Sequence, residues 1–160
     1  MVFQVLRFEM EQKVIGKDLT KEPPRSPNLL LGGYPILGRT LDKCRALLAG
    51  NIGEYHFDCP LDNTLFGWKR ILGDNFKAEV ATGASDEEMV KWLDTHGRPK
   101  TDEEKKAWSA EVKRASLYND PAKRDNFISE TRKLGLDPAT ATLFDWRDAD
   151  DKASFAPTGS

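Results

Sequence analysis

Residues 60–73 read PLDNTLFGWKRILG, and this stretch predicts the type of fold. Proline is tolerated in the first turn of a helix, so Pro60 marks a helix start. Apolar residues then recur at intervals of four, three and four positions before Gly73, namely Leu61, Leu65, Trp68 and Leu72. This spacing puts them on one face of a helix. The stretch therefore predicts an amphipathic helix that packs against a core.

Comparable signals occur on both sides of this stretch. Thr40 is a suitable cap for a helix over residues 40–49, with Gly50 as its stop. Ser85 and Glu88 form a capping box for a helix that ends at Gly97.

The same kinds of start and stop predict further helices at residues 74–83, 101–115, 120–134 and 137–146. Residues 52–57 are expected to form a loop or an isolated strand. The fold class is mainly α, an irregular bundle of six or seven short helices.

Three prolines fall within five residues of the segment Lys17–Pro27, which excludes a helix interior there. We expect an extended proline-rich N-terminal arm. Its Pro-x-x-Pro match at residues 24–27 could fit an aromatic groove of a partner, although packing on the domain's own surface is the commoner role. The predicted organisation is an N-terminal extension (1–16), a single helical domain (17–150) and a disordered tail (151–160).

The composition narrows the classes of function. A chain of 160 residues with 39% hydrophobic content is about one domain long, and a net charge of -2 argues against a nucleic-acid partner. Apolar runs are too short to span a membrane, and the first residues lack the pattern of a signal peptide. Cys44 and Cys59 are too few for a disulfide framework, so we expect free thiols and a cytoplasmic location. Oligomeric state and cofactor stay unknown.

Residues 54–62 read EYHFDCPLD and hold the densest set of reactive side chains. Cys59 directly precedes the predicted helix start, where backbone N–H groups favour a thiolate. His56 could act as its base, and Asp62 completes the predicted catalytic set. The more common alternative is structural, with Cys59 packed in the core and Asp58 or Asp62 capping the helix. A transition metal bound by His56, Asp58 and Asp62, with Glu54, is a third possibility, but the spacing matches no zinc motif and no metal site is predicted.

Residues around this junction form a predicted ligand-binding set, consisting of Arg39, Arg45, Tyr55, Asp58 and Trp68. Arg39, Lys43 and Arg45 make a basic group that could receive a carboxylate or phosphate. Ordinary surface charge is the simpler interpretation of that group. The four tryptophans are expected to fill the core between helices.

Several runs carry a family resemblance: Asp18-Leu19-Thr20, residues 23–27, Leu31-Gly32-Gly33, Asp42-Lys43, Leu48-Ala49-Gly50, Gly53-Glu54-Tyr55 and residues 59–62. With these runs the sequence resembles a bacterial family described as domain of unknown function 5069. The resemblance covers roughly residues 17–150 and implies a single domain. It implies no catalytic residue, because the family has no assigned reaction.

Two hypotheses on function follow. The first is a small-molecule-binding helical domain, which acts as an enzyme if Cys59 is a nucleophile, His56 its base and Arg39 or Arg45 an anion anchor. The alternative is a protein-interaction module that uses the proline-rich arm or an exposed helix face.

Overall fold

The computed structural model describes residues 14–157. These residues contain seven α-helices and no β-strand, with one isolated bridge between Leu31 and Tyr34. The helices are α2 (Leu37–Ala49), α3 (Pro60–Lys69), α4 (Gly73–Val80), α5 (Asp86–Thr95), α6 (Asp102–Arg114), α7 (Arg124–Lys133) and α8 (Leu143–Ser154). The predicted mainly α class is confirmed. Most of the predicted N-terminal extension, residues 1–13, lies outside the described residues.

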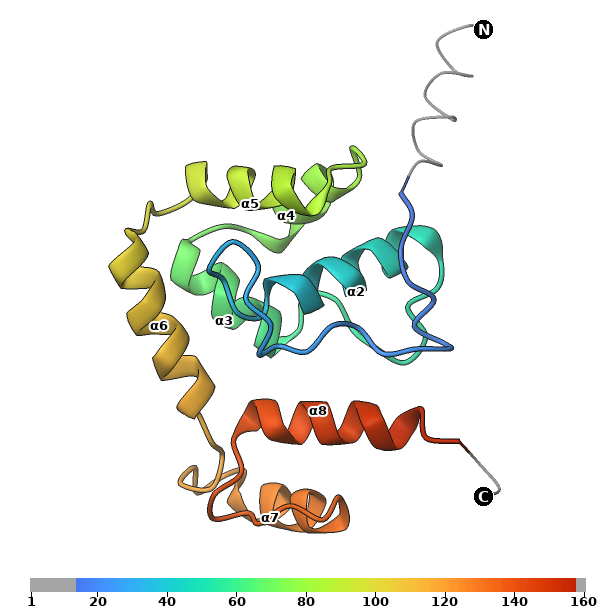
Figure 1. Cartoon of the computed structure of the whole chain (residues 1–160), viewed down its shortest axis with the longest axis vertical. Coiled ribbons are helices and arrows are strands. Elements are labelled where there is room, and N and C mark those ends of the chain that lie inside the picture. Colours follow the sequence, from blue (N-terminus) through green and yellow to red (C-terminus); the bar gives the residue numbers. More distant parts are fainter. Residues whose placement is uncertain (1–13, 158–160) are drawn as a thin grey trace, which may run out of the picture.

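Helix α2 lies at the centre of the molecule, between the α4–α5 pair on one side and α8 on the other (Figure 1). It contacts α3 and α4 directly, and nine of its 13 residues are buried. Its own Leu41 packs with large apolar side chains from the neighbouring helices, namely Leu65, Phe66, Phe76, Met89, Leu93 and Phe144. A helix that is buried on most of its surface must also bury its polar side chains, which then need partners.

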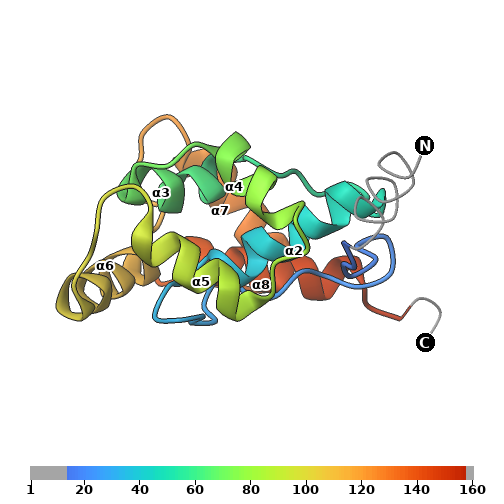
Figure 2. The ribbon, with the colours of Figure 1, turned by 90° about the horizontal axis from the view of Figure 1, so that it is seen from above.

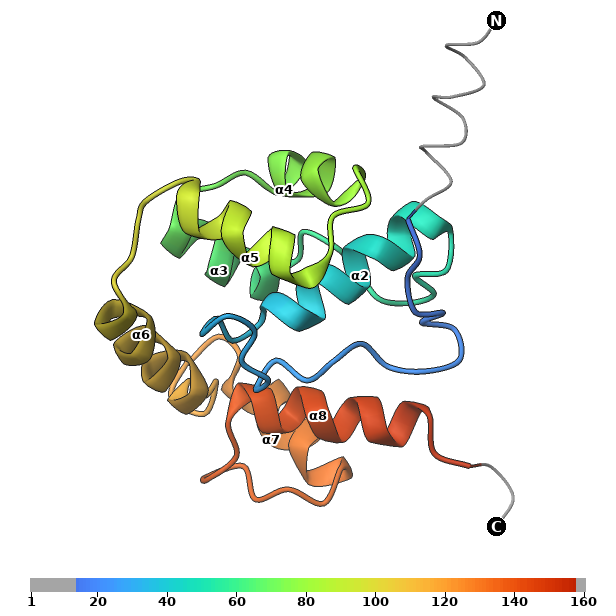
Figure 3. The same ribbon diagram turned by 45° about the horizontal axis from the view of Figure 1, so that its top comes forward.

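The other helices surround this centre. Helix α6 lies at one end of the molecule, far from the C-terminal end of α8 (Figures 1 and 2). It contacts α8. Helices α7 and α8 lie together on the opposite side of the molecule from α4 and α5 (Figure 3). No helix within residues 14–157 has the length and apolar character needed to cross a membrane.

Charged residues of α2 join four other segments. Arg39 pairs with Asp151 of α8 at 2.6 Å, and Lys43 pairs with Asp62 of α3 at 2.9 Å. Asp42 binds Arg25 of the N-terminal arm, while Arg45 binds Asp86 of α5. Arg39 and Lys43 are only 4% and 3% exposed. The interpretation of Arg39, Lys43 and Arg45 as ordinary surface charge is therefore wrong, because each bridges α2 to another helix.

The segment that precedes α2 is held against the helices by polar contacts. Arg25 reaches both Asp42 and Asp86, and Ser26 donates to Asp148 of α8 at 2.9 Å. Pro24 and Pro27 are buried. The two prolines of the Pro-x-x-Pro match thus pack on the protein's own surface.

Several helix ends differ from those expected. Helix α2 begins at Leu37, three residues before the proposed cap Thr40, whose hydroxyl instead binds Asp62. The last helix begins at Leu143, because Thr142 and Asp145 form a capping box there, while Asp137 closes a turn. Helix α8 continues to Ser154, so residues 151–154 belong to a helix and not to the predicted tail.

Candidate functional site

The start of α3 positions Cys59. Its backbone is extended, with ψ of 171°, and Pro60 takes the first helical position. The Asp62 carboxylate accepts hydrogen bonds from the backbone N–H groups of Asp58 at 2.9 Å and Cys59 at 3.4 Å. These contacts satisfy donors that a helix start leaves without partners. Asp62 therefore fixes the turn that holds the Cys59 side chain beside the helix N-terminus.

The neighbouring residue Asp58 has a local structural role. Its φ of 62° is left-handed, a conformation that aspartate tolerates better than most residues. Its carboxylate accepts a hydrogen bond from Asn63 at 2.9 Å and lies against Gly73, the first residue of α4. A Cβ atom at Gly73 would come within 2.6 Å of that carboxylate. Asp58 thus links the starts of two helices.

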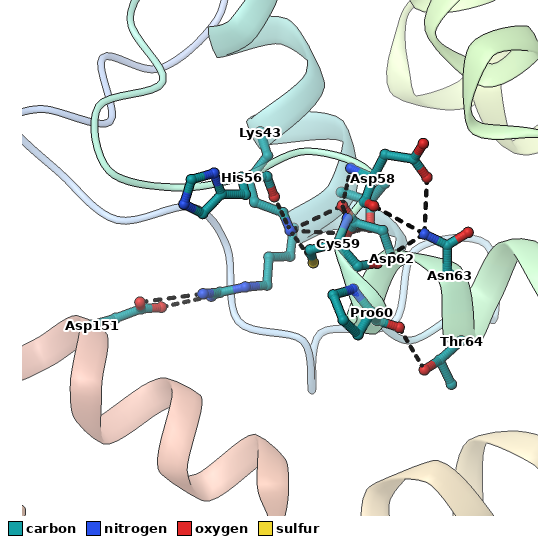
Figure 4. Close-up of polar contacts among 11 residues, drawn as sticks. Lys43, His56, Asp58, Cys59, Pro60, Asp62, Asn63, Thr64 and Asp151 are labelled. Carbon is teal, nitrogen blue, oxygen red and sulfur yellow. Dashed lines mark hydrogen bonds and ion pairs between the residues drawn. The ribbon is translucent and has the colours of Figure 1, made fainter. Parts of the chain in front are cut away.

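Lys43 reaches this turn from the middle of α2 (Figure 4). Its ammonium lies 2.9 and 3.0 Å from the two Asp62 carboxylate oxygens, 3.0 Å from the carbonyl of His56 and 3.2 Å from Cys59 Sγ. The three N–H groups of the ammonium thus have three acceptor groups, namely one carboxylate, one carbonyl and one sulfur. Asp62 is fully buried and also accepts from the Thr40 hydroxyl at 2.6 Å. The thiol of Cys59 therefore lies beside a cation that is held in place by a buried carboxylate.

The predicted catalytic residues are only partly brought together. Cys59 and Asp62 share Lys43 as a neighbour. The His56 ring is exposed and, among the described contacts, forms no hydrogen bond with Cys59. Figure 4 shows the imidazole turned away from the sulfur. Lys43, and not His56, is the group that contacts the thiol.

Two of the predicted ligand-binding residues form a second polar cluster. The Arg39 guanidinium contacts both carboxylate oxygens of Asp151, at 2.6 and 3.3 Å. Tyr55 donates its hydroxyl to Asp151 at 2.7 Å, and Phe155 stacks on its ring. Burial, and then the hydrogen bond to Asp151, raise the pKa of Tyr55. This cluster ties the loop before Cys59 to α8.

The remaining predicted ligand-binding residues lie elsewhere. Arg45 pairs with Asp86, and Trp68 stacks on Trp108 with ring centroids 4.2 Å apart. One hollow of about 220 Å³ has Arg45 in its wall, and another of about 440 Å³ lies between Tyr118 and Asp125. Cys59 lines neither of them. The predicted ligand-binding set does not surround one cavity.

The two cysteines have different environments. Cys44 is completely buried in the core, and this burial raises its pKa to about 12. Cys59 is half-buried and has Lys43 at its sulfur. Within residues 14–157, no three histidine, cysteine or acidic side chains lie together in a way that could hold a metal ion. Of the two thiols, Cys59 is the accessible one.

Sequence reasoning identified Cys59 and Asp62 but missed the roles of Lys43 and Thr40. A signal existed, because these residues are three positions apart and share one face of α2. Two polar residues on the face of a helix that packs into a core indicate a polar partner opposite them. The sequence did not show that this partner is Asp62, 19 and 22 residues further along.

The comparisons with known proteins identify a family without a known activity. A family model described as a domain of unknown function, DUF5069, matches residues 21–153. No curated protein matches the sequence. The matched region includes all seven helices except the last residue of α8, and it contains the cluster of Lys43, Cys59 and Asp62. The chain belongs to the DUF5069 family.

Proposed function

We propose that this chain is a small-molecule-binding helical domain in which the Cys59 thiol is the reactive group. The observation that carries the proposal is the Lys43 ammonium 3.2 Å from Cys59 Sγ. Thiolate is the nucleophilic form of cysteine, and a neighbouring cation favours it. The position at the start of α3 acts in the same direction.

The surroundings support a site that is organised before any ligand binds. A buried lysine costs free energy unless a carboxylate and further hydrogen bonds compensate, and Lys43 has both. Asp62 and Thr40 leave its ammonium little freedom, so its direction toward sulfur is set by the fold. Cys59 itself is only half-buried and stays within reach of a small electrophile.

In this proposal Lys43 is the neighbour that acts on the Cys59 thiol, through the positive charge of its ammonium, and no base role is assigned to His56. The substrate class is a small electrophile that accepts a thiolate, and the reaction begins with attack by sulfur. A cytoplasmic location is part of the proposal, and the two free thiols support it, because that compartment keeps thiols reduced.

Selective alkylation tests the proposal. Folded protein is treated with iodoacetamide over a range of pH, and labelling of each cysteine is followed by mass spectrometry. We expect Cys59 to react while Cys44 stays protected by burial. Lys43→Met, labelled under conditions in which circular dichroism shows it to be folded, should slow the labelling of Cys59 by about tenfold, since a charge next to the sulfur is lost.

Three further variants make this test specific. Lys106→Met removes an exposed lysine and serves as the matched control, with no expected change. Lys43→Arg keeps the positive charge and should retain most of the reactivity, and His56→Ala should change the rate less than about twofold. If Cys59 reacts as slowly as Cys44 in the folded protein, the proposal is wrong.

The alternative is a protein-interaction module, and one observation supports it. Leu29 and Leu30 are adjacent and 44% and 50% exposed, on the segment that leads into α2. Exposed apolar side chains of this kind occur at protein interfaces. The Pro-x-x-Pro version of the alternative has lost support because Pro24 and Pro27 are buried. Two unreactive thiols in the alkylation experiment would favour an interaction through the leucines.

A further inference from the structure

The Lys43–Cys59 contact has a second chemical consequence. The two side chains come from different helices, yet nitrogen and sulfur lie 3.2 Å apart. Asp62 holds the nitrogen in place, and the turn at Pro60 holds the sulfur. Oxidised cysteine condenses with nearby nitrogen to form a sulfenamide.

We propose that hydrogen peroxide converts this pair into a reversible covalent link between Lys43 Nζ and Cys59 Sγ. The inference rests on the proposed reactivity of Cys59 and adds an oxidant, peroxide, and a product to it. It assigns Lys43 a second role, as the group that captures the oxidised sulfur. The link would join α2 to the start of α3.

The first step oxidises sulfur. Cys59 Sγ attacks one oxygen of hydrogen peroxide, an S–O bond forms and the O–O bond breaks. One molecule of water leaves, and Cys59 becomes a sulfenic acid. Peroxide is the group that is reduced. Cys59 is half-buried, so a molecule as small as peroxide can reach it.

The second step forms the link. The Lys43 ammonium transfers a proton to Asp62, whose carboxylate lies 2.9 Å away, and becomes a neutral amine. The amine attacks Sγ, the S–O bond breaks, and the leaving hydroxide takes the second proton from nitrogen as water. The sum is one thiol, one amine and one peroxide giving one sulfenamide and two water molecules. A thiol reductant reverses the change.

The geometry also explains what the link would do. It removes the charge of Lys43 from the buried pair and leaves Asp62 protonated, so oxidation would change the electrostatics of the site as well as block its thiol. It would also protect Cys59 from further, irreversible oxidation. The pair would then act as a redox switch on the proposed thiol chemistry.

Peptide mapping tests this inference in a Cys44→Ala variant, in which a disulfide between the two cysteines is impossible. The protein is treated with hydrogen peroxide, remaining thiols are blocked, and the sample is digested with trypsin without reductant. We expect a product in which residues 40–45 are joined to residues 46–69, lighter than the two peptides by two hydrogen atoms. Trypsin should no longer cut after Lys43, and dithiothreitol should restore both peptides.

The control is Lys43→Arg in the same background, which keeps a cation beside the sulfur but should give no link. If Cys59 is oxidised only to sulfinic or sulfonic acid while trypsin still cuts after Lys43, the inference is wrong and the proposed reactivity stands. If Cys59 reacts with neither peroxide nor iodoacetamide, both proposals fail. The Cys44→Ala protein carries the intact pair, so the result does not depend on the fold of a Lys43 variant.

Discussion

Lys43 and Lys69 are both buried lysines, but they are stabilised differently. Lys43 has a carboxylate, a carbonyl and a sulfur atom around its ammonium. Lys69, at the end of α3, is fully buried and donates to the carbonyl of Arg98 at 2.8 Å, and the described residues show no ion pair for it. Burial lowers the pKa of Lys69, although Asp94 counters this effect.

The difference between the two lysines shows which contacts stabilise a buried charge. An ion pair with further hydrogen bonds holds a charge firmly, and removing one partner then leaves the other uncompensated. A buried ammonium with one carbonyl partner is held weakly, and an apolar side chain of similar size could replace it. The Lys43 pair is therefore expected to be essential for stability, whereas Lys69 should be dispensable.

The largest effect should come from Asp62→Asn. The amide keeps the size of the carboxylate but leaves the Lys43 ammonium buried without a counter-charge. We expect a loss of about 3–5 kcal/mol in the free energy of unfolding, measured by urea denaturation. Asp74→Asn, at an exposed position in the first turn of α4, is the matched control and should cost less than about 1 kcal/mol. Equal effects of the two substitutions would show that the Lys43 pair is not held as described.

A smaller effect is expected from Lys69→Met. The variant loses one hydrogen bond to Arg98, which lowers the free energy of unfolding, but it no longer buries a charge, which raises that free energy. The free energy of unfolding should stay within about 1 kcal/mol of the original value. Lys43→Met, measured in the same way, should be much more destabilising because it leaves Asp62 buried and unpaired. A loss at Lys69 as large as that at Lys43 would remove the distinction between the two lysines.

The smallest effect should appear in the pH dependence of stability. Because the pKa of Lys69 is lowered in the folded protein, the unfolded chain holds this proton more tightly. The contribution of Lys69 to the free energy of unfolding should therefore rise with pH as the pH passes from the folded pKa up to the ordinary value of 10.5. Below that interval the side chain is protonated in both states and the contribution is constant.

Subtracting the Lys69→Met curve from that of the unaltered protein isolates this contribution from the other lysines. The charges that also act on Lys69 are Asp94, Lys100 and Lys105, and all three remain in the variant. A difference that falls with rising pH would contradict the lowered pKa.

The sequence by itself determined the helical class and many of the helix ends. Gly50 ends α2 with φ of 79°, and Pro60 opens α3, as predicted. The capping box of Ser85 and Glu88 is confirmed at 3.1 and 3.3 Å. These signals depend on residues within one helical turn of each other, so the local sequence is enough to specify them.

Only the tertiary structure decided which charges are buried and which groups meet. Asp62 is 19 residues from Lys43, and Asp151 is 112 residues from Arg39. Partners this far apart cannot be predicted from neighbouring residues. The sequence therefore indicated that Arg39 and Lys43 are surface charges and that Asp151 is part of a disordered tail. His56 seemed the natural partner of Cys59 because it is near in sequence, but α2 brings Lys43 to the sulfur instead. The physical reason is that a charge enters the core only when folding brings its counter-charge to it.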